Sequence, residues 1–183
     1  MLMVAALAVT AHADPAPAKQ EVAILAGGCF WGMENVMRLA PGVLSIEVGY
    51  AGGKSAQTSY DQVKHGDTGH AEAVRIVFDP TKISYADLLA HWYFRSHDPT
   101  QLDHQNNDWG TQYRSEIFTT TQDQARVAAD IKAKVDRSGK WKKPIVTKIE
   151  TATTWVRAED YHQDYLIKHP NGYNDHWLRP FDF

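Results

Sequence analysis

The stretch EVAILAGGCFWGMENVMRLA, residues 21–40, decides the fold of this 183-residue chain. Residues 21–26 form a short apolar run that ends at Gly27-Gly28, which is typical of a buried strand stopped by a flexible turn. Residues 31–40 then carry apolar side chains at helical spacing, and a Pro-Gly pair ends that segment. The stretch therefore predicts a strand, a glycine turn and a helix, with Cys29 at the junction between the turn and the helix.

Further strands and helices interleave along the rest of the chain. The clearest strand is at residues 71–78, where apolar and polar residues alternate with a period of two. We also expect strands at 43–50, 114–119 and 145–151, helices starting near Ser84 and Thr121 and spanning 158–168, and a long loop at 97–112. This pattern predicts an α+β fold, a two-layer α/β sandwich with a mixed sheet and a ferredoxin-like core.

The composition is that of an ordinary globular protein. Hydrophobic residues make up 43% and charged residues 22%, and the formal net charge is −3. A chain of this length supports one well-buried core, so we expect a single domain over residues 21–183. The weak net charge gives no reason to expect a nucleic acid or a membrane surface as partner, and we expect a monomer.

The N-terminus predicts a targeting segment. Residues 1–9 are almost wholly apolar, and Ala11-His12-Ala13 has the small-x-small pattern of a signal peptidase site. The apolar run is much shorter than the roughly 20 residues that span a bilayer. We expect a signal peptide at 1–13, a disordered lead-in at 14–20, and export to the periplasm. Because no Lys or Arg precedes the apolar run, a cytoplasmic location is the alternative.

Cys29 is the only cysteine, so the chain forms no internal disulfide. A cysteine at a helix N-terminus feels the positive end of the helix dipole and unpaired N–H groups, and both favour the reactive thiolate. The flanking glycines also allow a ligand to approach closely. The alternative is a buried cysteine that only packs in an aromatic turn.

The motif GCFWG at residues 28–32 is the first of a series that runs in order along the chain. The others are GYAGG at 49–53, SY at 59–60, GHAEAV at 69–74, DP at 79–80, HDPT at 97–100, DWGTQYRS at 108–115 and AEDYHQ at 158–163. Together they closely resemble the signature of the A-type peptide methionine sulfoxide reductases. The resemblance covers residues 22–169, and so many ordered motifs are highly specific.

The resemblance implies a thiol-dependent oxidoreductase that repairs proteins under oxidative stress. The family's thiolate attacks the sulfur of methionine S-sulfoxide, releases methionine and leaves a sulfenic acid, a role that falls on Cys29. The departing oxygen needs a proton, and Glu72 matches the family's acid. Its carboxyl must then stay protonated, so we expect an apolar site to raise the pKa of Glu72.

The resemblance also implies a substrate pocket without a metal or cofactor. Tyr60 and Tyr113 match the phenols that hydrogen-bond the sulfoxide oxygen, and Asp108 matches a polar residue of the same pocket. Phe30 and Trp31 resemble the apolar wall that receives the methyl group.

Two departures from the family concern regeneration of the enzyme. Many relatives carry a second cysteine before the glycine turn ahead of the glutamate, where this chain has Lys64-His65, or in a C-terminal tail, which here ends WLRPFDF. With one thiol, the sulfenic acid requires an external reductant, for which we expect thioredoxin, glutaredoxin or a small thiol. The long loop also lacks a glycine that the family shows before Asn107-Asp108.

Three other functions fit parts of the sequence. A thiol hydrolase needs Cys29 and a histidine base, for which His70 and His162 are the candidates. A metal-binding module would use histidines such as His97 and His104, although their spacing is not that of a zinc site. A non-catalytic redox or binding protein would consume no sulfoxide at all.

Overall fold

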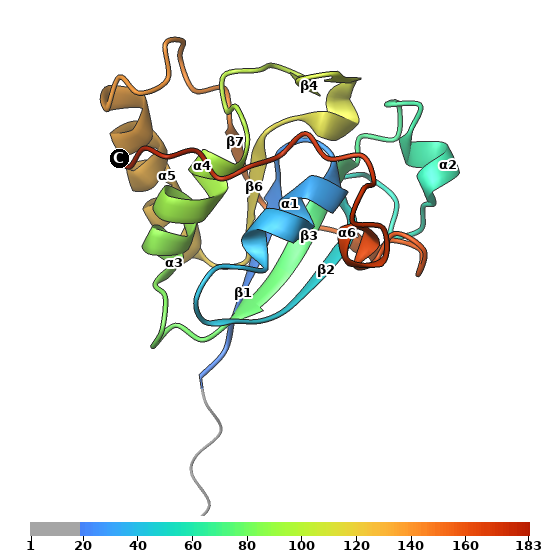
Figure 1. The fold of residues 1–183 in the computed structure, drawn as a ribbon, viewed down its shortest axis with the longest axis horizontal. Coiled ribbons are helices and arrows are strands. Elements are labelled where there is room, and N and C mark those ends of the chain that lie inside the picture. Colours follow the sequence, from blue (N-terminus) through green and yellow to red (C-terminus); the bar gives the residue numbers. More distant parts are fainter. Residues whose placement is uncertain (1–18) are drawn as a thin grey trace, which may run out of the picture.

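The computed structural model describes residues 19–183, which fold around one six-stranded sheet (Figure 1). The predicted signal peptide at 1–13 and residues 14–18 of the predicted lead-in lie outside the described residues. Within residues 19–183, no helix is both long and apolar enough to cross a membrane.

The sheet is mixed, as the sequence predicts. Its strands lie in the order β7-β6-β1-β3-β2-β8, and only the β6–β7 pair is parallel. The strands are β1 (Glu21–Ala26), β2 (Val43–Ala51), β3 (Ala71–Phe78), β6 (Glu116–Thr119), β7 (Lys148–Thr151) and β8 (Trp155–Arg157). The antiparallel order β6-β1-β3-β2 is compatible with the ferredoxin-like core, and that finer assignment stays a prediction.

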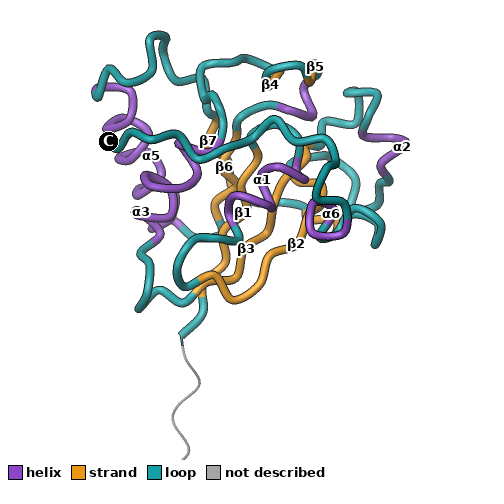
Figure 2. Tube along the Cα trace, viewed as in Figure 1, coloured by secondary structure: helices purple, strands orange, loops and turns teal. Residues whose placement is uncertain are grey.

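Short helices and long loops make up the rest of the chain (Figure 2). The helices are α1 (Phe30–Met37), α2 (Tyr60–Val63), α3 (Tyr85–Asp87), α4 (Phe94–Ser96), α5 (Gln122–Arg137) and α6 (Tyr165–Lys168). A π-helix, η1 (Leu88–Tyr93), joins α3 to α4, and a 3₁₀ turn, η2 (Thr111–Tyr113), precedes β6. The loop predicted at 97–112 contains a small ladder between β4 (His104–Gln105) and β5 (Asp108–Trp109).

Successive side chains along each strand point to opposite faces of the sheet, so the core has a larger cluster on the helix-covered face and a smaller cluster on the other face. Leu25, Val74 and Ile117 point to the face that α1, η1 and α5 cover, and they belong to the larger core cluster. Ile24 and Phe118 point the other way, into a smaller cluster. The domain therefore has the two-layer α+β architecture that the pattern predicts.

The predicted helix at 158–168 is wrong for most of its length. Residues 158–164 form an irregular segment, and only Tyr165–Lys168 are helical. Ala158 donates its backbone N–H to the carbonyl of Val48, and the Gln163 amide bonds both the N–H and the carbonyl of Val48. These contacts with the sheet replace helical hydrogen bonds, because they satisfy backbone groups that the end of the β2–β8 pairing leaves open.

Two buried tyrosines offer a matched test of how this fold is held together. The Tyr93 hydroxyl donates to the carbonyl of Ala26 at 2.8 Å, directly before the glycine turn. The Tyr85 hydroxyl is buried without a hydrogen-bond partner in the described residues. Tyr93→Phe should lower the free energy of unfolding by about 1–2 kcal/mol, whereas Tyr85→Phe should be neutral or stabilising. Equal losses for the two variants in urea denaturation would contradict this assignment.

Candidate active site

Cys29 is the N-cap residue of α1, as the sequence predicts. Its backbone is non-helical, with φ −58° and ψ 123°, and its carbonyl accepts the first helical hydrogen bond, from the N–H of Met33. The side chain is 7% exposed. The N–H groups of the first helical turn therefore lie beside the sulfur, where helix N-termini attract negative charge.

The glycines around Cys29 are required by the side chains packed against them. A Cβ on Gly27 would lie 2.8 Å from the ring of His97, and one on Gly32 would lie 2.5 Å from Nδ1 of His176. Gly28 has a φ of +96°, which disfavours any other residue. The turn is thus enclosed by groups that come from distant parts of the chain.

Glu72 reaches the same turn from β3. Its carboxyl, 2% exposed, accepts a hydrogen bond of 3.1 Å from the backbone N–H of Phe30, the residue after the cysteine. Burial raises the pKa of Glu72 to about 8, outweighing the opposite effect of that hydrogen bond, and the charges of Asp108 and Asp175 add to the rise. The carboxyl therefore carries a proton at neutral pH.

The pKa of the Cys29 thiol is raised, which corrects the expectation that its helix position favours the thiolate. Burial is the largest cause and the charge of Glu72 is the second, and together they outweigh the hydrogen bond from the N–H of Trp31. While Glu72 is protonated its charge is absent, so burial alone accounts for most of the rise. The resting site is thus a thiol beside a carboxylic acid.

All seven residues predicted for the site line one cavity of about 120 Å³, together with one residue that the sequence analysis missed. The lining residues are Cys29, Phe30, Trp31, Tyr60, Glu72, Asp108, Tyr113 and Tyr173. Tyr173 comes from the C-terminal segment and donates its hydroxyl proton to Asp108 at 3.1 Å. No sequence motif marks Tyr173, because only the path of that segment brings it to the cavity.

Contacts behind the cavity hold its aromatic walls in place. The Trp31 ring stacks on Tyr165 with centroids 3.7 Å apart, and its Nε1–H donates to Nδ1 of His162 at 3.1 Å. Glu159 accepts from the backbone N–H of Tyr60 and from the hydroxyl of Tyr50. These bonds tie residues 159–165 to α1, α2 and β2, so the walls are set before any ligand enters.

The phenols of the cavity keep their protons. Burial raises the pKa of Tyr60 and of Tyr113, and the charge of Glu72 adds to both. A protonated phenol donates a hydrogen bond, so both residues are suited to an oxygen acceptor inside the cavity.

Neither histidine proposed as a hydrolase base lines this cavity. The ring of His70 bonds the Thr68 hydroxyl and the carbonyl of Ser55, and His162 is engaged by the Trp31 indole. The geometry thus pairs the thiol with an acid and not with a base, which acyl transfer would require. Within residues 19–183, no group of three or more His, Cys, Asp or Glu side chains is arranged to hold a metal ion.

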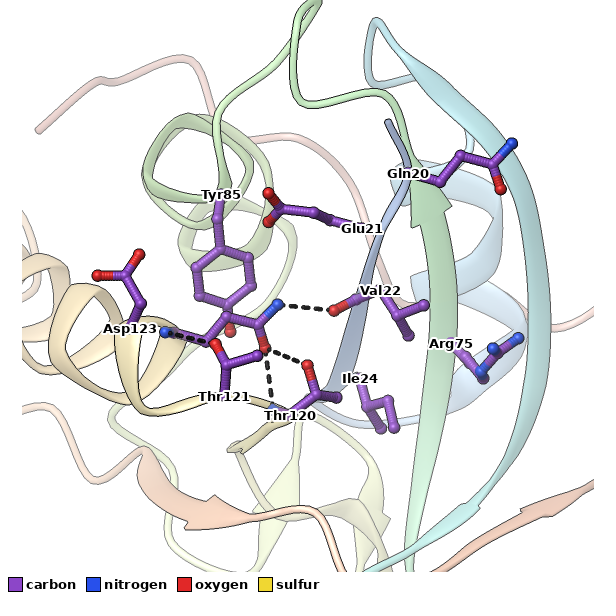
Figure 3. A pocket seen from close by; sticks show the side chains of 10 residues that line it. Gln20, Glu21, Val22, Ile24, Arg75, Tyr85, Thr120, Thr121 and Asp123 are labelled. Atoms are coloured by element: carbon purple, nitrogen blue, oxygen red, sulfur yellow. Dashed lines mark hydrogen bonds between the residues drawn. The ribbon is translucent and has the colours of Figure 1, made fainter. Parts of the chain in front are cut away.

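A larger cavity, of about 650 Å³, lies at the opposite end of β1 (Figure 3). Its main polar groups already bond one another: the Gln124 amide donates to the carbonyl of Val22 and accepts from the N–H and hydroxyl of Thr120. It contains no thiol, so the smaller cavity at Cys29 is the candidate active site.

Comparison with known proteins yields one consistent family. The family model described as "Peptide methionine sulfoxide reductase" matches residues 21–182. The peptide methionine sulfoxide reductase MsrA of Nocardia farcinica is 50% identical over 158 residues, which is 86% of this chain and 90% of that protein.

Solved structures are similar over most of the chain. Mxr1 from Saccharomyces cerevisiae in its reduced form has a TM-score of 0.83 and 37% identity, covering 91% of this chain and 96% of that one. Mxr1 in complex with Trx2 has a TM-score of 0.60 and 26% identity, covering 91% and 95%.

The coupling between the two ionisable groups can be measured by alkylation. Glu72→Gln should speed the reaction of Cys29 with iodoacetamide above about pH 8, because the amide removes the carboxylate charge that raises the pKa of the thiol. The pKa should stay above that of a free cysteine, since burial remains. Glu47→Gln, a half-buried glutamate of β2 outside the cavity, is the control. Equal alkylation of the Glu72 variant and the parent would show that the two groups do not interact.

Proposed function

The chain belongs to the peptide methionine sulfoxide reductase family, and we propose that Cys29 and Glu72 perform its reaction at the N-terminus of α1. The reaction is the thiol-dependent reduction of methionine S-sulfoxide, free or in proteins, to methionine, and it repairs oxidised proteins. One observation carries the assignment of the two residues. A buried carboxyl, protonated at neutral pH, bonds the backbone beside the only thiol, and both groups line one cavity.

The cavity suits the two ends of a sulfoxide group. Phe30 and Trp31 form an apolar wall for the methyl group, where burial excludes water. Tyr60 and Tyr113, which keep their protons, donate hydrogen bonds to the sulfoxide oxygen. Asp108, anchored by the Tyr173 hydroxyl, orients the polar side of the pocket.

The chemical step exchanges one oxygen between two sulfur atoms. The Cys29 sulfur attacks the sulfoxide sulfur while Glu72 protonates the oxygen, which makes oxygen a viable leaving group. The oxygen then adds to the Cys29 sulfur as the bond between the two sulfur atoms breaks, so Cys29 becomes a sulfenic acid and methionine is released. The cysteine sulfur is oxidised by two electrons and the sulfoxide sulfur is reduced by two. The thiol proton returns to Glu72, so the acid is restored within the same turnover.

Regeneration uses an external thiol, because the chain has no second cysteine. The thiol attacks the sulfenic sulfur and water leaves, which produces a mixed disulfide on Cys29; a second thiol then opens this disulfide. The similarity to Mxr1 in complex with Trx2 supports a thioredoxin as donor, with glutaredoxin or a small thiol as the other candidates.

We also propose that the protein is exported, with residues 1–13 as its signal peptide, on the apolar pattern of that segment. Expression of the full chain in a Gram-negative host should give a periplasmic product that starts near Asp14. An unprocessed product in the cytosolic fraction would contradict export.

The role of Glu72 as proton donor predicts a specific kinetic loss. Glu72→Gln should slow methionine formation in a single turnover by roughly 10²–10⁴-fold, the usual contribution of general acid catalysis. The parent rate should fall as the pH rises above about 8, where the raised pKa of Glu72 is passed and the donor proton is lost. Glu47→Gln should retain the parent rate and pH profile. A Glu72 variant that slows only the thiol-dependent recycling would show that Glu72 has a different role.

The single cysteine predicts the stoichiometry of the first half-reaction. Without reductant, methionine sulfoxide should yield about one methionine per chain, with a mass increase of one oxygen that dimedone traps at Cys29. Cys29→Ser should yield none, because an alkoxide forms far less readily than a thiolate. A smaller burst together with a disulfide-linked dimer would mean that a second subunit resolves the intermediate.

A further inference from the structure

The C-terminal tail, defined here as residues 172–183, crosses over α1 and the glycine turn (Figure 1). It is anchored along its length. The Asn106 amide donates to the carbonyl of Asp175 at 3.1 Å, and the backbone N–H of Arg179 donates to the carbonyl of Arg95 at 3.1 Å. Between these anchors lies His176, which is 4% exposed and which the reaction above does not use.

Both ring nitrogens of His176 face acceptors. Nε2 lies 2.7 Å from the carbonyl oxygen of Gly27, and Nδ1 lies 2.6 Å from Oδ1 of Asp175. A carbonyl only accepts hydrogen bonds, and so does an ionised carboxylate, whereas neutral imidazole donates from one nitrogen only. Both bonds form together only if His176 and Asp175 share two protons, and where Asp175 is ionised both of these protons are on the ring, which is then an imidazolium.

The surrounding charges are consistent with that pair. Burial opposes ionisation of Asp175, but the hydrogen bond and positive charge of His176, together with the hydrogen bond from Asn106, outweigh burial and lower the pKa of Asp175. Burial, followed by the positive charges of His176 and Arg179, lowers the pKa of His97 to about 3, which keeps that ring neutral. The charge of Asp108 on β5 also interacts with His176, and Asp98 faces Arg179 on the same tail.

The ring of His176 also forms a surface on which the catalytic turn rests. A Cβ on Gly28 would lie 2.9 Å from its Cε1, and one on Gly32 would lie 2.5 Å from its Nδ1. The imidazole therefore contacts the turn before Cys29 and the first turn of α1 after it. These two segments set the direction of the Cys29 side chain.

We propose that His176 is a positioning residue for the reaction: as a buried imidazolium it joins Asp175 to the Gly27 carbonyl and fixes the turn that carries Cys29. The proposal rests on the proposed function of Cys29. Displacement of a reacting group by about 1 Å can cost roughly 10²-fold in rate, so loss of this bond should act on the chemical step more than on binding.

The protonation of the ring can be observed directly in the wild-type protein. In ¹⁵N NMR of histidine-labelled full chain at pH 7, both His176 nitrogens should show the chemical shifts of protonated nitrogens. Asp175→Asn should change this signature toward a neutral ring, because an amide N–H can donate to Nδ1 while Nε2–H still bonds Gly27. A neutral His176 ring in the wild type would overturn the imidazolium.

The positioning role is tested by a series at one position. His176→Ala should lower the single-turnover rate of methionine formation about 10- to 100-fold with a KM within about threefold of the parent. His176→Gln, which can still donate an amide N–H to the Gly27 carbonyl, should restore a substantial part of that rate. His65→Ala removes an exposed histidine outside the cavity and the tail and should leave the rate unchanged.

Each outcome separates this proposal from the function on which it rests. A His176→Ala variant that is folded and as fast as the parent would refute the positioning role, as would a Gln variant no better than Ala. If Ala fails to fold, the Gln variant and the NMR signature decide. A parent chain that forms no methionine would refute the proposed function. The NMR measurement would still test the protonation of His176, because it does not depend on activity.

Discussion

The burial of one carboxyl group under a helix N-terminus is the constraint on which the site depends. Glu72 lies on the helix-covered face of β3, and its only described partner is the N–H of Phe30, so the carboxylate form is poorly compensated. Its charge in turn disfavours the thiolate of Cys29. The ionisation of Glu72 and that of Cys29 are therefore coupled: when one group is charged, ionisation of the other costs more free energy. In the proposed reaction this conflict is removed, because the Cys29 sulfur carries no negative charge once it bonds the substrate sulfur and the thiol proton returns to Glu72.

The glycine turn shows how distant parts of the chain determine a local motif. Gly27 is closed by His97 from the end of α4, Gly28 by Gln105 from β4, and Gly32 by the C-terminal tail. Each of these neighbours is itself held by hydrogen bonds: the Gln105 amide, for example, donates to the carbonyl of Asp98 and accepts from its backbone N–H. Three distant segments thus pack against this short motif. Its glycines are needed because larger side chains would collide with these segments, and also because the turn needs a flexible backbone.

The sequence predicts those parts of the site that depend on residues close together in the chain, and it misses those that depend on residues far apart. The strand-turn-helix unit at Cys29 and the strand at 71–78 depend on alternation, helical spacing and turn residues, all of which are visible in the sequence. The rise in the pKa of Cys29 was missed, because burial depends on tertiary packing that helix position alone does not reveal. Tyr173 and the irregular segment at 158–164 were missed for the same reason. Their conformations are set by Asp108 and by the backbone of Val48, which are far away in sequence.

The small size of the cavity constrains the order of events. Its volume of about 120 Å³ is close to that of one short side chain, and Cys29 is 7% exposed at its base. A reducing thiol must reach the same sulfur, since the chain has no second cysteine to which the oxidation could pass. Methionine therefore has to leave before the reductant enters, which is the order of a ping-pong reaction. In the proposed reaction, the walls that position the sulfoxide also limit which thiols can follow it, so the packing around α1 sets both substrate selection and reductant selection.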